Sequence, residues 1–556
     1  MLQARRNRSR LWISILCILP LLLVSLLTGC KPQTPAEPTF NPMDVLQPSD
    51  RPTTAPDADP DPGSVLSTPT LPAPAAPEAG TKTVYNIQGD FDVSNMFMNC
   101  TQTVDYINNT GKTQNELYFN LYPNAFKNTT TAPYPDDEIA DGWPYPSGFD
   151  PGSIIMSEVQ IGGEIISFAL EQDDQIMRVP LATPVEPGKR VELNMMFSIK
   201  LPLALGRFGY GPYTVRLGNW YPQLCAYDKS GWCKNPYYKI GYPYNADIAD
   251  YKVTIVAIPQ VQFFAPGEVS KTEGDARNTW TCTAENLRGF ALVASNPGSD
   301  LSQSLASTAL EVDGVTVTSV YAKGDAEEYG RKVGQIAADA LAIYNRRFGM
   351  YPYKTLTLVM SECYIGGASY PGLVMLDEGV YKKQYMDQIL EPTVAAMVAQ
   401  QWWNGVVGVD QANEDWMATG LAEYCAMIYQ KDQYGEKVRD IIYNNNVVKQ
   451  LYMPLRNNEG WDVSKEVVAR NAGEFTVYSE YEGLVRGKAV IMFKHLQDDL
   501  GDGAFYKFLV DYYQQYGYKH AVQTNLIDIA EKASGQSLSS FFQDWLTGVA
   551  VPPEAQ

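Results

Sequence analysis

The chain has 556 residues, 45% of them hydrophobic, which is enough for large cores and for more than one domain of typical size. Its net charge is −20, and such an acidic chain is unsuited to binding nucleic acid or to electrostatic docking on anionic lipid. Only two histidines occur, His495 and His520, so the chain contains no His-x-x-x-His pair of the kind that binds zinc.

The N-terminus reads as a bacterial export signal. Four arginines precede an apolar run at residues 11–27, and the run ends in Leu27-Thr28-Gly29-Cys30. This ending resembles the lipobox of bacterial lipoproteins, in which the cysteine is lipidated after cleavage. An uncleaved membrane helix is less favoured, because seventeen apolar residues are slightly short for a span. We expect a signal peptide at 1–29 and a lipid on Cys30 that anchors the protein to the extracytoplasmic face of the bacterial cell membrane.

Residues 30–80 are predicted to be a linker. Thirteen prolines fall between Lys31 and Gly80, together with Thr, Ala and Asp and almost no aromatic residues. Such a composition cannot bury a core and favours extended, polyproline-like chain. We expect this segment to hold the folded part away from the membrane.

Residues 81–310 carry the signature of β-structure. Alternating apolar and polar stretches at 101–107, 117–121, 191–199 and 251–257 are separated by Gly, Pro and Asn turns. From residue 311 onward helical periodicity dominates, beginning with an amphipathic helix at 325–347 and a strand at 355–360. Two helices joined by a turn-rich loop are expected in 391–426, the second starting near Glu414 and Asp415.

Several segments together resemble one family of enzymes. Gln401-Trp402-Trp403-Asn404-Gly405 and the segment Trp416–Ala422 are similar to the sequences around the zinc site of the gluzincin metallopeptidases, in particular the membrane alanine aminopeptidase (aminopeptidase N) family. The runs at 116–125 and 219–232 resemble N-terminal segments of its shorter bacterial members. The resemblance implies a multi-domain protein, with a β-rich saddle- or sandwich-like domain at 81–310 followed by a thermolysin-like α+β domain at 311–556.

The chemistry of the family is missing at the matching positions. The two zinc-binding histidines correspond to Ala396 and Gln400, and the general-base glutamate corresponds to Met397. The third ligand lies nineteen residues after the second histidine in the family, and that position is Thr419. The tyrosine that stabilises the tetrahedral intermediate aligns with Arg486. A catalytic zinc needs three protein ligands and a carboxylate base, so we predict neither metal ligands nor catalytic residues.

The substrate-binding strand of the family aligns with Gly367, Ala368 and Ser369, where Ser369 replaces the glutamate that binds the peptide's amino group. We predict these residues and Arg486 as peptide contacts, since an arginine can hold a carboxylate with two hydrogen bonds. The alternative is that such side chains only fill the former pocket.

The functional prediction is a pseudo-peptidase that binds a peptide or an envelope protein. The family's cofactor is zinc, but because its ligands are missing, no cofactor is expected. Two alternatives stay open: a purely structural envelope protein, and a hydrolase with non-standard site residues. Five acids are candidates for the latter: Glu378, Glu391, Glu414, Asp415 and Glu423.

Cys225 and Cys233 flank a glycine-containing turn, and an exported protein can form disulfides. A disulfide between them and a pair of buried, reduced cysteines are equally compatible with the sequence.

Overall fold

The computed structural model describes residues 71–298, 305–363, 366–382, 389–458, 461–548 and 550–555. All of them belong to one compact unit, Thr53–Gln556. The predicted signal peptide and Cys30 lie outside the described residues. Among the helices that are described, none is long and apolar enough to cross a membrane.

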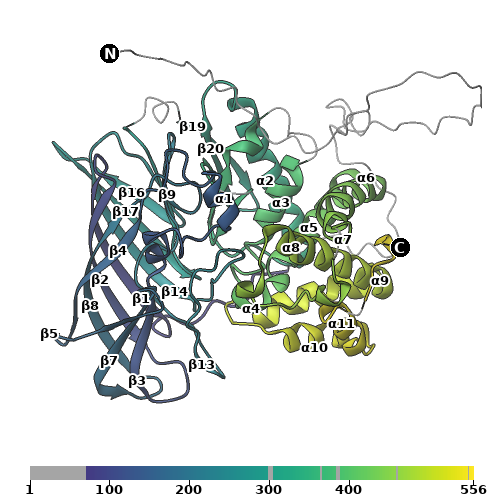
Figure 1. Ribbon diagram of the computed structural model, residues 1–556, viewed down its shortest axis with the longest axis horizontal. Coiled ribbons are helices and arrows are strands. Elements are labelled where there is room, and N and C mark those ends of the chain that lie inside the picture. The colour runs from purple at the N-terminus through teal and green to yellow at the C-terminus, as the bar shows by residue number, and fades with distance from the viewer. Residues whose placement is uncertain are drawn as a thin grey trace, which may run out of the picture. The chain divides into compact units, whose positions relative to one another are not determined.

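Strands β1 to β18 form the first half of the described chain, seen in purple to teal in Figure 1. They make an eight-stranded sheet in the order β16-β17-β14-β1-β2-β8-β4-β5, two four-stranded sheets in the orders β15-β18-β10-β9 and β11-β3-β7-β6, and the hairpin β12-β13. The strands are β1 (Thr83–Asp92), β2 (Phe97–Ile107), β3 (Gln114–Asn120), β4 (Ser153–Ile161), β5 (Glu164–Ile165), β6 (Ala169–Glu171), β7 (Ile176–Val185), β8 (Arg190–Lys200), β9 (Phe208–Tyr210), β10 (Thr214–Leu217), β11 (Gln223–Leu224), β12 (Tyr227–Asp228), β13 (Gly231–Trp232), β14 (Ala249–Ala257), β15 (Phe263–Phe264), β16 (Glu268–Thr272), β17 (Asn278–Leu287) and β18 (Leu292–Ser295), with the short helices η3 (Tyr122–Lys127) and α1 (Asp136–Ala140) between β3 and β4.

The alternation in the sequence sets the faces of the large sheet. Along β2, every second residue is buried and the residues that alternate with them are more exposed; the buried ones are Met98, Cys100, Gln102, Val104 and Tyr106. Successive side chains of a strand point to opposite faces, so these residues share the core face of the sheet. The four stretches predicted as strands correspond to β2, β3, β8 and β14.

The second half contains one more sheet and most of the helices, seen in green to yellow in Figure 1. The five-stranded sheet has the order β19-β20-β21-β23-β22, so β22 lies at its edge. Its strands are β19 (Leu305–Val312), β20 (Val315–Ala322), β21 (Thr355–Ser361), β22 (Gly367–Tyr370) and β23 (Leu373–Asp377). The helices are α2 (Glu327–Phe348), η5 (Glu378–Tyr381), α3 (Glu391–Ala399), α4 (Gln411–Glu414), η8 (Asp415–Met417), α5 (Thr419–Tyr434), α6 (Glu436–Ile442), η9 (Tyr443–Tyr452), α7 (Met453–Arg456), η10 (Val463–Lys465), η11 (Ala472–Glu474), α8 (Tyr478–Tyr481), η12 (Glu482–Lys488), α9 (Ala489–Tyr516), α10 (Gln523–Ser534), α11 (Ser539–Leu546) and η13 (Pro553–Ala555).

This arrangement, a multi-sheet β part followed by a largely helical part, confirms the predicted fold class. The predicted helix 325–347 corresponds to α2, which packs against β19, β20 and α3. Strand β19 runs across the domain boundary predicted at residues 310 and 311.

The second helix of the predicted pair starts later than expected. Its predicted start near Glu414 and Asp415 is taken by the short helices α4 and η8, and α5 begins only at Thr419. The backbone leaves helical geometry at Glu414, where φ is −137° and ψ is 37°, and this ends α4 before η8 and α5 begin.

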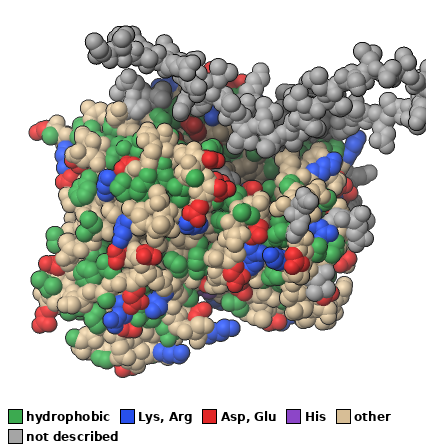
Figure 2. Space-filling model, viewed as in Figure 1, with side chains coloured by type: hydrophobic (Ala, Val, Ile, Leu, Met, Phe, Trp, Pro, Cys, Tyr) green, Lys and Arg blue, Asp and Glu red, His purple; other side chains and the backbone are tan. Residues whose placement is uncertain are grey.

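The end of the predicted linker contacts the folded part. The carbonyl oxygen of Leu71 accepts a hydrogen bond of 2.8 Å from the backbone amide of Met350, and that of Pro72 accepts one of 2.7 Å from the Gln514 side chain. Acidic and basic side chains are interspersed over the face of the molecule seen in Figure 2.

Candidate functional site

Helices α3 and α5 pack against each other and bring the family-aligned positions together. On α3, Ala396 and Gln400 are one turn apart, because the Gln400 amide donates a 3.0 Å hydrogen bond to the Ala396 carbonyl. Ala396 is buried, whereas Met397 and Gln400 are partly exposed. One helical face therefore presents a methyl group, a thioether and a neutral amide where a metallopeptidase of this family has two imidazoles and a carboxylate.

Thr419, the first residue of α5, is engaged within the protein. Its hydroxyl donates a 2.8 Å hydrogen bond to the Asp415 carboxylate, which also accepts one of 2.8 Å from the Gln411 amide and one of 2.5 Å from the Tyr481 hydroxyl. Burial raises the pKa of Asp415, and these three hydrogen bonds oppose that rise. The Thr419 hydroxyl thus supports a buried acid.

Arg486 lies in η12, a π-helical segment, and contacts two carboxylates. Its nearest nitrogens lie 2.8 Å from a Glu423 carboxylate oxygen and 3.1 Å from one of Glu482. Burial raises the pKa of Glu482, while Arg486 acts to lower it. The positive charge of Arg486 is therefore balanced from within, and a ligand carboxylate would have to compete with both glutamates.

The edge strand β22 is tied to α3 through Ser369. The Ser369 hydroxyl donates a 2.9 Å hydrogen bond to the Met397 carbonyl and accepts one of 2.8 Å from the Gln401 amide. Gly367 has a φ of 138°, and a Cβ there would lie 2.3 Å from the Met375 carbonyl oxygen, so this position requires glycine. The strand is thus held rigidly beside the helix that carries Ala396.

The five acids considered as alternative catalytic groups have separate structural partners. Glu391 accepts a hydrogen bond from the Tyr434 hydroxyl, and Glu414 accepts one from the backbone amide of Gln523. Glu423 pairs with Arg486. Glu378 opens η5, and Asp415 is the buried acid described above. Within the described ranges, no three His, Cys, Asp or Glu side chains gather in a way that could hold a metal ion.

A small cavity of about 50 Å³ lies beside these positions, with walls from both the β part and the helical part. Arg207, Tyr242, Tyr478 and Tyr481 are among its lining residues. Sequence reasoning missed Arg207 and Tyr242, because nothing in their local sequence distinguishes them. The structure connects Tyr481 to the site through its hydrogen bond to Asp415.

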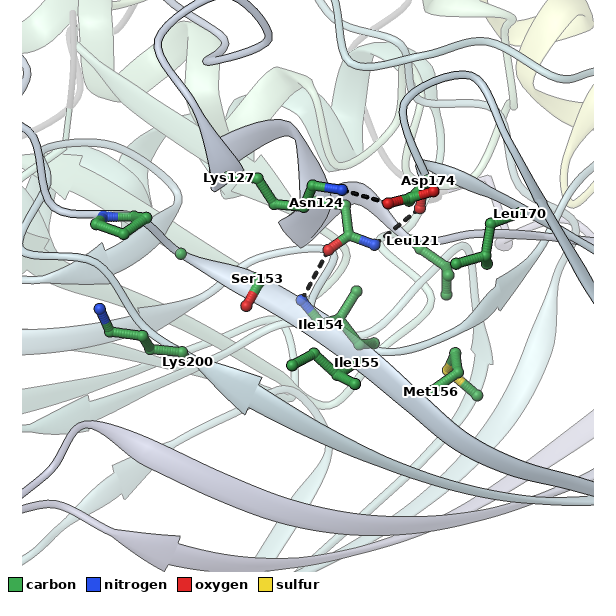
Figure 3. A pocket seen from close by; sticks show the side chains of 12 residues that line it. Leu121, Asn124, Lys127, Ser153, Ile154, Ile155, Met156, Leu170, Asp174 and Lys200 are labelled. Atoms are coloured by element: carbon green, nitrogen blue, oxygen red, sulfur yellow. Dashed lines mark hydrogen bonds and ion pairs between the residues drawn. The ribbon is translucent and has the colours of Figure 1, made fainter.

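A larger, open pocket of about 390 Å³ lies on the β part (Figure 3). Asn124, from the run that resembles the family's N-terminal domain, donates a 2.8 Å hydrogen bond to the Asp174 carbonyl and accepts one of 3.1 Å from the Ile154 amide. Lys127 pairs with the Asp174 carboxylate. Asn124 therefore joins η3 to the turn between β6 and β7 and to the start of β4, which is a structural role.

The described cysteines carry free thiols, including Cys225 and Cys233. Cys225 is buried, and its thiol lies 3.3 Å from the Asn120 side-chain oxygen. Burial raises the pKa of this thiol. Of the two possibilities left open by the sequence, the structure has the buried, reduced cysteine.

Comparison with known proteins shows which family of domains the helical part resembles. The model of the Peptidase family M1 domain matches residues 335–545. Aminopeptidase N of Streptomyces lividans is 21% identical over 208 residues, 36% of this chain and 24% of the relative. Endoplasmic reticulum aminopeptidase 2 of Homo sapiens is 22% identical over 223 residues, 37% of this chain and 22% of the relative. The chain thus spans about a quarter of the length of these relatives.

Solved structures resemble the chain over most of its length. The M1 zinc metallopeptidase from Deinococcus radiodurans superimposes with a TM-score of 0.56 at 15% identity, covering 85% of this chain and 96% of that chain. A mutant M1 zinc metallopeptidase from Deinococcus radiodurans with a Tyr-Ser-Ala substrate bound gives a TM-score of 0.58 at 14% identity, and covers 85% of this chain and 96% of that chain. At such identity the likeness establishes the fold.

These matches correct the expectation that no cofactor is involved, because zinc is the cofactor that the family implies. The side chains present at the aligned positions do not fit that ion. Ala396 has no donor atom, Gln400 offers only a neutral amide, and the hydroxyl of Thr419 is bonded to Asp415. No reaction step through zinc follows from these residues.

The matched domain, the two-part fold and the preserved spacing of the helix pair α3 and α5 agree with one another. Residues 335–545 thus resemble the Peptidase family M1 domain, and the chain has the two-part fold of M1 zinc metallopeptidases of known structure.

Proposed function

We propose that this chain is an aminopeptidase-N-like protein of the cell envelope that binds peptides without hydrolysing them. The observation that carries the proposal is the set of side chains at the aligned catalytic positions. Met397 cannot act as a general base, and Arg486 in place of the tyrosine is paired with Glu423 and Glu482. Losses at several catalytic positions leave little turnover, since single replacements of such groups each lower rates by orders of magnitude.

Peptide binding is supported by the geometry that the chain retains. Strand β22 ends its sheet, so an extended peptide can pair with its outer edge through backbone hydrogen bonds. Gly367, Ala368 and Ser369 form most of this strand, and Ser369 holds it against α3. The strand that would align a substrate is therefore rigid even though the catalytic groups differ.

The proposal predicts that the full chain, purified in detergent and supplied with Zn²⁺, shows no chelator-sensitive hydrolysis of aminoacyl p-nitroanilides or short peptides. Calorimetry with trialanine should detect saturable binding. Chelator-sensitive turnover that co-purifies with the protein at constant specific activity would overturn the inactive assignment. Absence of binding by any short peptide would favour the purely structural alternative.

A variant that restores the family's groups provides a matched positive control. It combines Ala396→His, Met397→Glu, Gln400→His and Thr419→Glu. We expect it to bind about one Zn²⁺ per chain by atomic emission, because three ligands then face one another across α3 and α5. A folded variant that binds no additional zinc compared with the wild-type chain would show that the helices do not place these positions as aligned.

The proposed location is the extracytoplasmic face of a bacterial membrane, with lipid on Cys30 as the anchor and a peptide or envelope protein as the partner. The export signal and lipobox-like ending support it. The acidic composition argues against a nucleic-acid partner.

A further inference from the structure

Arg207 is a cation that lies against two tyrosine rings. It precedes β9, and the central carbon of its guanidinium group lies 3.8 Å from the ring centre of Tyr242 and 5.1 Å from that of Tyr244. Its guanidinium makes no ion pair or hydrogen bond with any residue that the structure describes. Arginines elsewhere in the β part differ: Arg216 pairs with Glu362, and Arg277 pairs with Asp90.

The charge of Arg207 persists in this environment. Burial is the largest single influence on its pKa and acts to lower it, but the electrostatic effects of the surrounding tyrosines, Tyr244 first among them, together raise the pKa above its ordinary value. A guanidinium group has five N–H donors, and leaving them unbonded in a partly buried site is unfavourable. The tyrosine rings attract the cation but accept no hydrogen bond in the plane of the group. The donors of Arg207 are therefore available to an anion.

The cavity of about 50 Å³ gives that anion a place to bind. It is lined by Arg207, Lys239, Tyr242, Tyr478 and Tyr481, among others. Lys239 is already paired with Asp136, so Arg207 is the lining cation that has no carboxylate in direct contact among the described residues. A volume of this size exceeds what one water molecule needs and suits a small group such as a carboxylate.

The cavity adjoins the peptide-binding strand and the former catalytic positions. The hydroxyl of Tyr481 bonds to Asp415, which also holds Thr419. On another side, the ring centre of Tyr244 lies 6.2 Å from that of Tyr370, the last residue of β22. A peptide paired with β22 would thus end or turn close to this cavity.

We propose that Arg207 binds a carboxylate of the peptide ligand in this cavity. The inference rests on the proposed peptide-binding function and names the chemistry that the ligand must carry: a C-terminal carboxylate or an Asp or Glu side chain. A planar guanidinium group can hold a carboxylate with two parallel hydrogen bonds. Arg486, the arginine suggested by the sequence, is occupied by its own two glutamates.

The site can be tested with acetate alone, which makes its test independent of peptide binding. The full chain in detergent is labelled with ¹⁵N at the arginine Nε atoms and titrated with sodium acetate, with sodium chloride at equal ionic strength as the control. The resonance absent from the Arg207→Gln variant should shift saturably with acetate and stay unchanged with chloride. An unchanged resonance, or equal shifts with both salts, would overturn the proposal.

Three peptides distinguish the two sources of carboxylate. Trialanine has a free C-terminus, Ala-Glu-Ala amide has only a side-chain carboxylate, and trialanine amide has neither. We expect at least one of the first two to bind at least tenfold more tightly than trialanine amide by calorimetry. Equal affinity of all three for the wild-type chain would contradict the proposal, and this comparison needs no variant to fold.

Variants then assign the effect to Arg207. Arg207→Gln should reduce the affinity for the preferred peptide to that for trialanine amide, and Arg207→Lys should restore part of it. Arg331→Gln, which removes an exposed arginine paired with Glu327 on α2, is the matched control and should bind as the wild type does. If acetate binds at Arg207 but no peptide binds, the carboxylate site stands and the proposed function fails.

Discussion

At the scale of single residues, Asp415 explains why Thr419 is not a substitute ligand. The carboxylate of Asp415 is buried and accepts hydrogen bonds from Gln411, Thr419 and Tyr481. A buried acid requires such partners, because an ionised carboxylate without them is strongly destabilised. The polar groups at this former catalytic position therefore satisfy one another.

Removing one partner of Asp415 should change the pH dependence of stability. Because burial raises the pKa of Asp415, its carboxyl group binds a proton more tightly in the folded protein than in the unfolded chain. The free energy of unfolding therefore falls as pH rises from the unfolded pKa of Asp415 to its folded pKa. Tyr481→Phe removes a hydrogen bond that lowers the pKa. We expect a loss of about 1.5–3 kcal/mol at neutral pH, and a smaller loss near about pH 4.

Urea unfolding at a series of pH values measures this effect. Tyr329→Phe, which removes a hydroxyl from a partly exposed tyrosine on α2, is the control and should follow the wild-type curve. If the free energy of unfolding depended on pH in the same way for Tyr481→Phe and the wild type, the hydrogen bond from Tyr481 would not affect the titration of Asp415.

At the scale of elements, a buried ion pair joins the β part to the five-stranded sheet. Arg216 on β10 contacts Glu362, directly after β21, at 2.5 Å, and both side chains are almost fully buried. Glu362 also accepts hydrogen bonds from the backbone amides of Tyr213 and Thr214. The ion pair therefore links two sheets whose strands are distant in sequence.

Glu362→Gln should therefore destabilise the protein by about 3–5 kcal/mol, since it leaves the buried charge of Arg216 without a carboxylate to balance it. Thermal or urea unfolding measures the loss. The double variant Arg216→Met, Glu362→Met should be less destabilised than Glu362→Gln, because it removes both charges together. A single variant as stable as the wild type would refute this role for the pair.

A second contact between elements should depend on pH. His495 on α9 lies 3.2 Å from the Glu554 carboxylate in η13, and this hydrogen bond raises the pKa of His495. Burial acts to raise the pKa of Glu554, but hydrogen bonds from His495 and Tyr443 lower it to about 2. The His495 contribution is complete below its unfolded pKa of about 6.5 and is lost as pH rises through the higher folded value.

The Glu554 contribution has the opposite sign: it is present above an unfolded pKa of about 4.3 and is lost as pH falls toward about 2. Both contributions coexist between about pH 4.3 and 6.5. The difference in unfolding free energy between the wild type and Glu554→Gln should therefore be larger at pH 5.5 than at pH 8.5. Titration of His495 by NMR should show its pKa fall in the variant, and an unchanged pKa would contradict the contact.

At the scale of the whole molecule, we expect the proposed lipid anchor to determine location without affecting the stability of the folded part. The described chain begins at residue 71, and Leu71 and Pro72 already contact Met350 and Gln514. If the lipid on Cys30 is the anchor, Cys30→Ala should move the protein from the membrane fraction to the soluble fraction after export. Its stability to urea should be unchanged, and continued membrane retention of the variant would argue for an uncleaved helix instead.

The sequence alone indicated the resemblance to the aminopeptidase N family, the order of the β-rich and helical parts, and the presence of the helix pair. These features follow from local periodicity and from sequence motifs whose large side chains pack in the core. Trp402, Trp403 and Trp416 are examples, and all three are fully buried. The same local information aligned Ala396, Met397, Gln400, Thr419 and Arg486 with the catalytic positions of the family.

Only the tertiary structure decided what those side chains do. Thr419 bonds to Asp415 and Arg486 to two glutamates, while Arg207, far earlier in the chain, is the arginine left without an acceptor among the described residues. The π-helical geometry of η12, with its wider turns, also changes which side chains face inward relative to a count of residues. Whether a charge is free or paired depends on neighbours that are distant in sequence, and no local pattern encodes it.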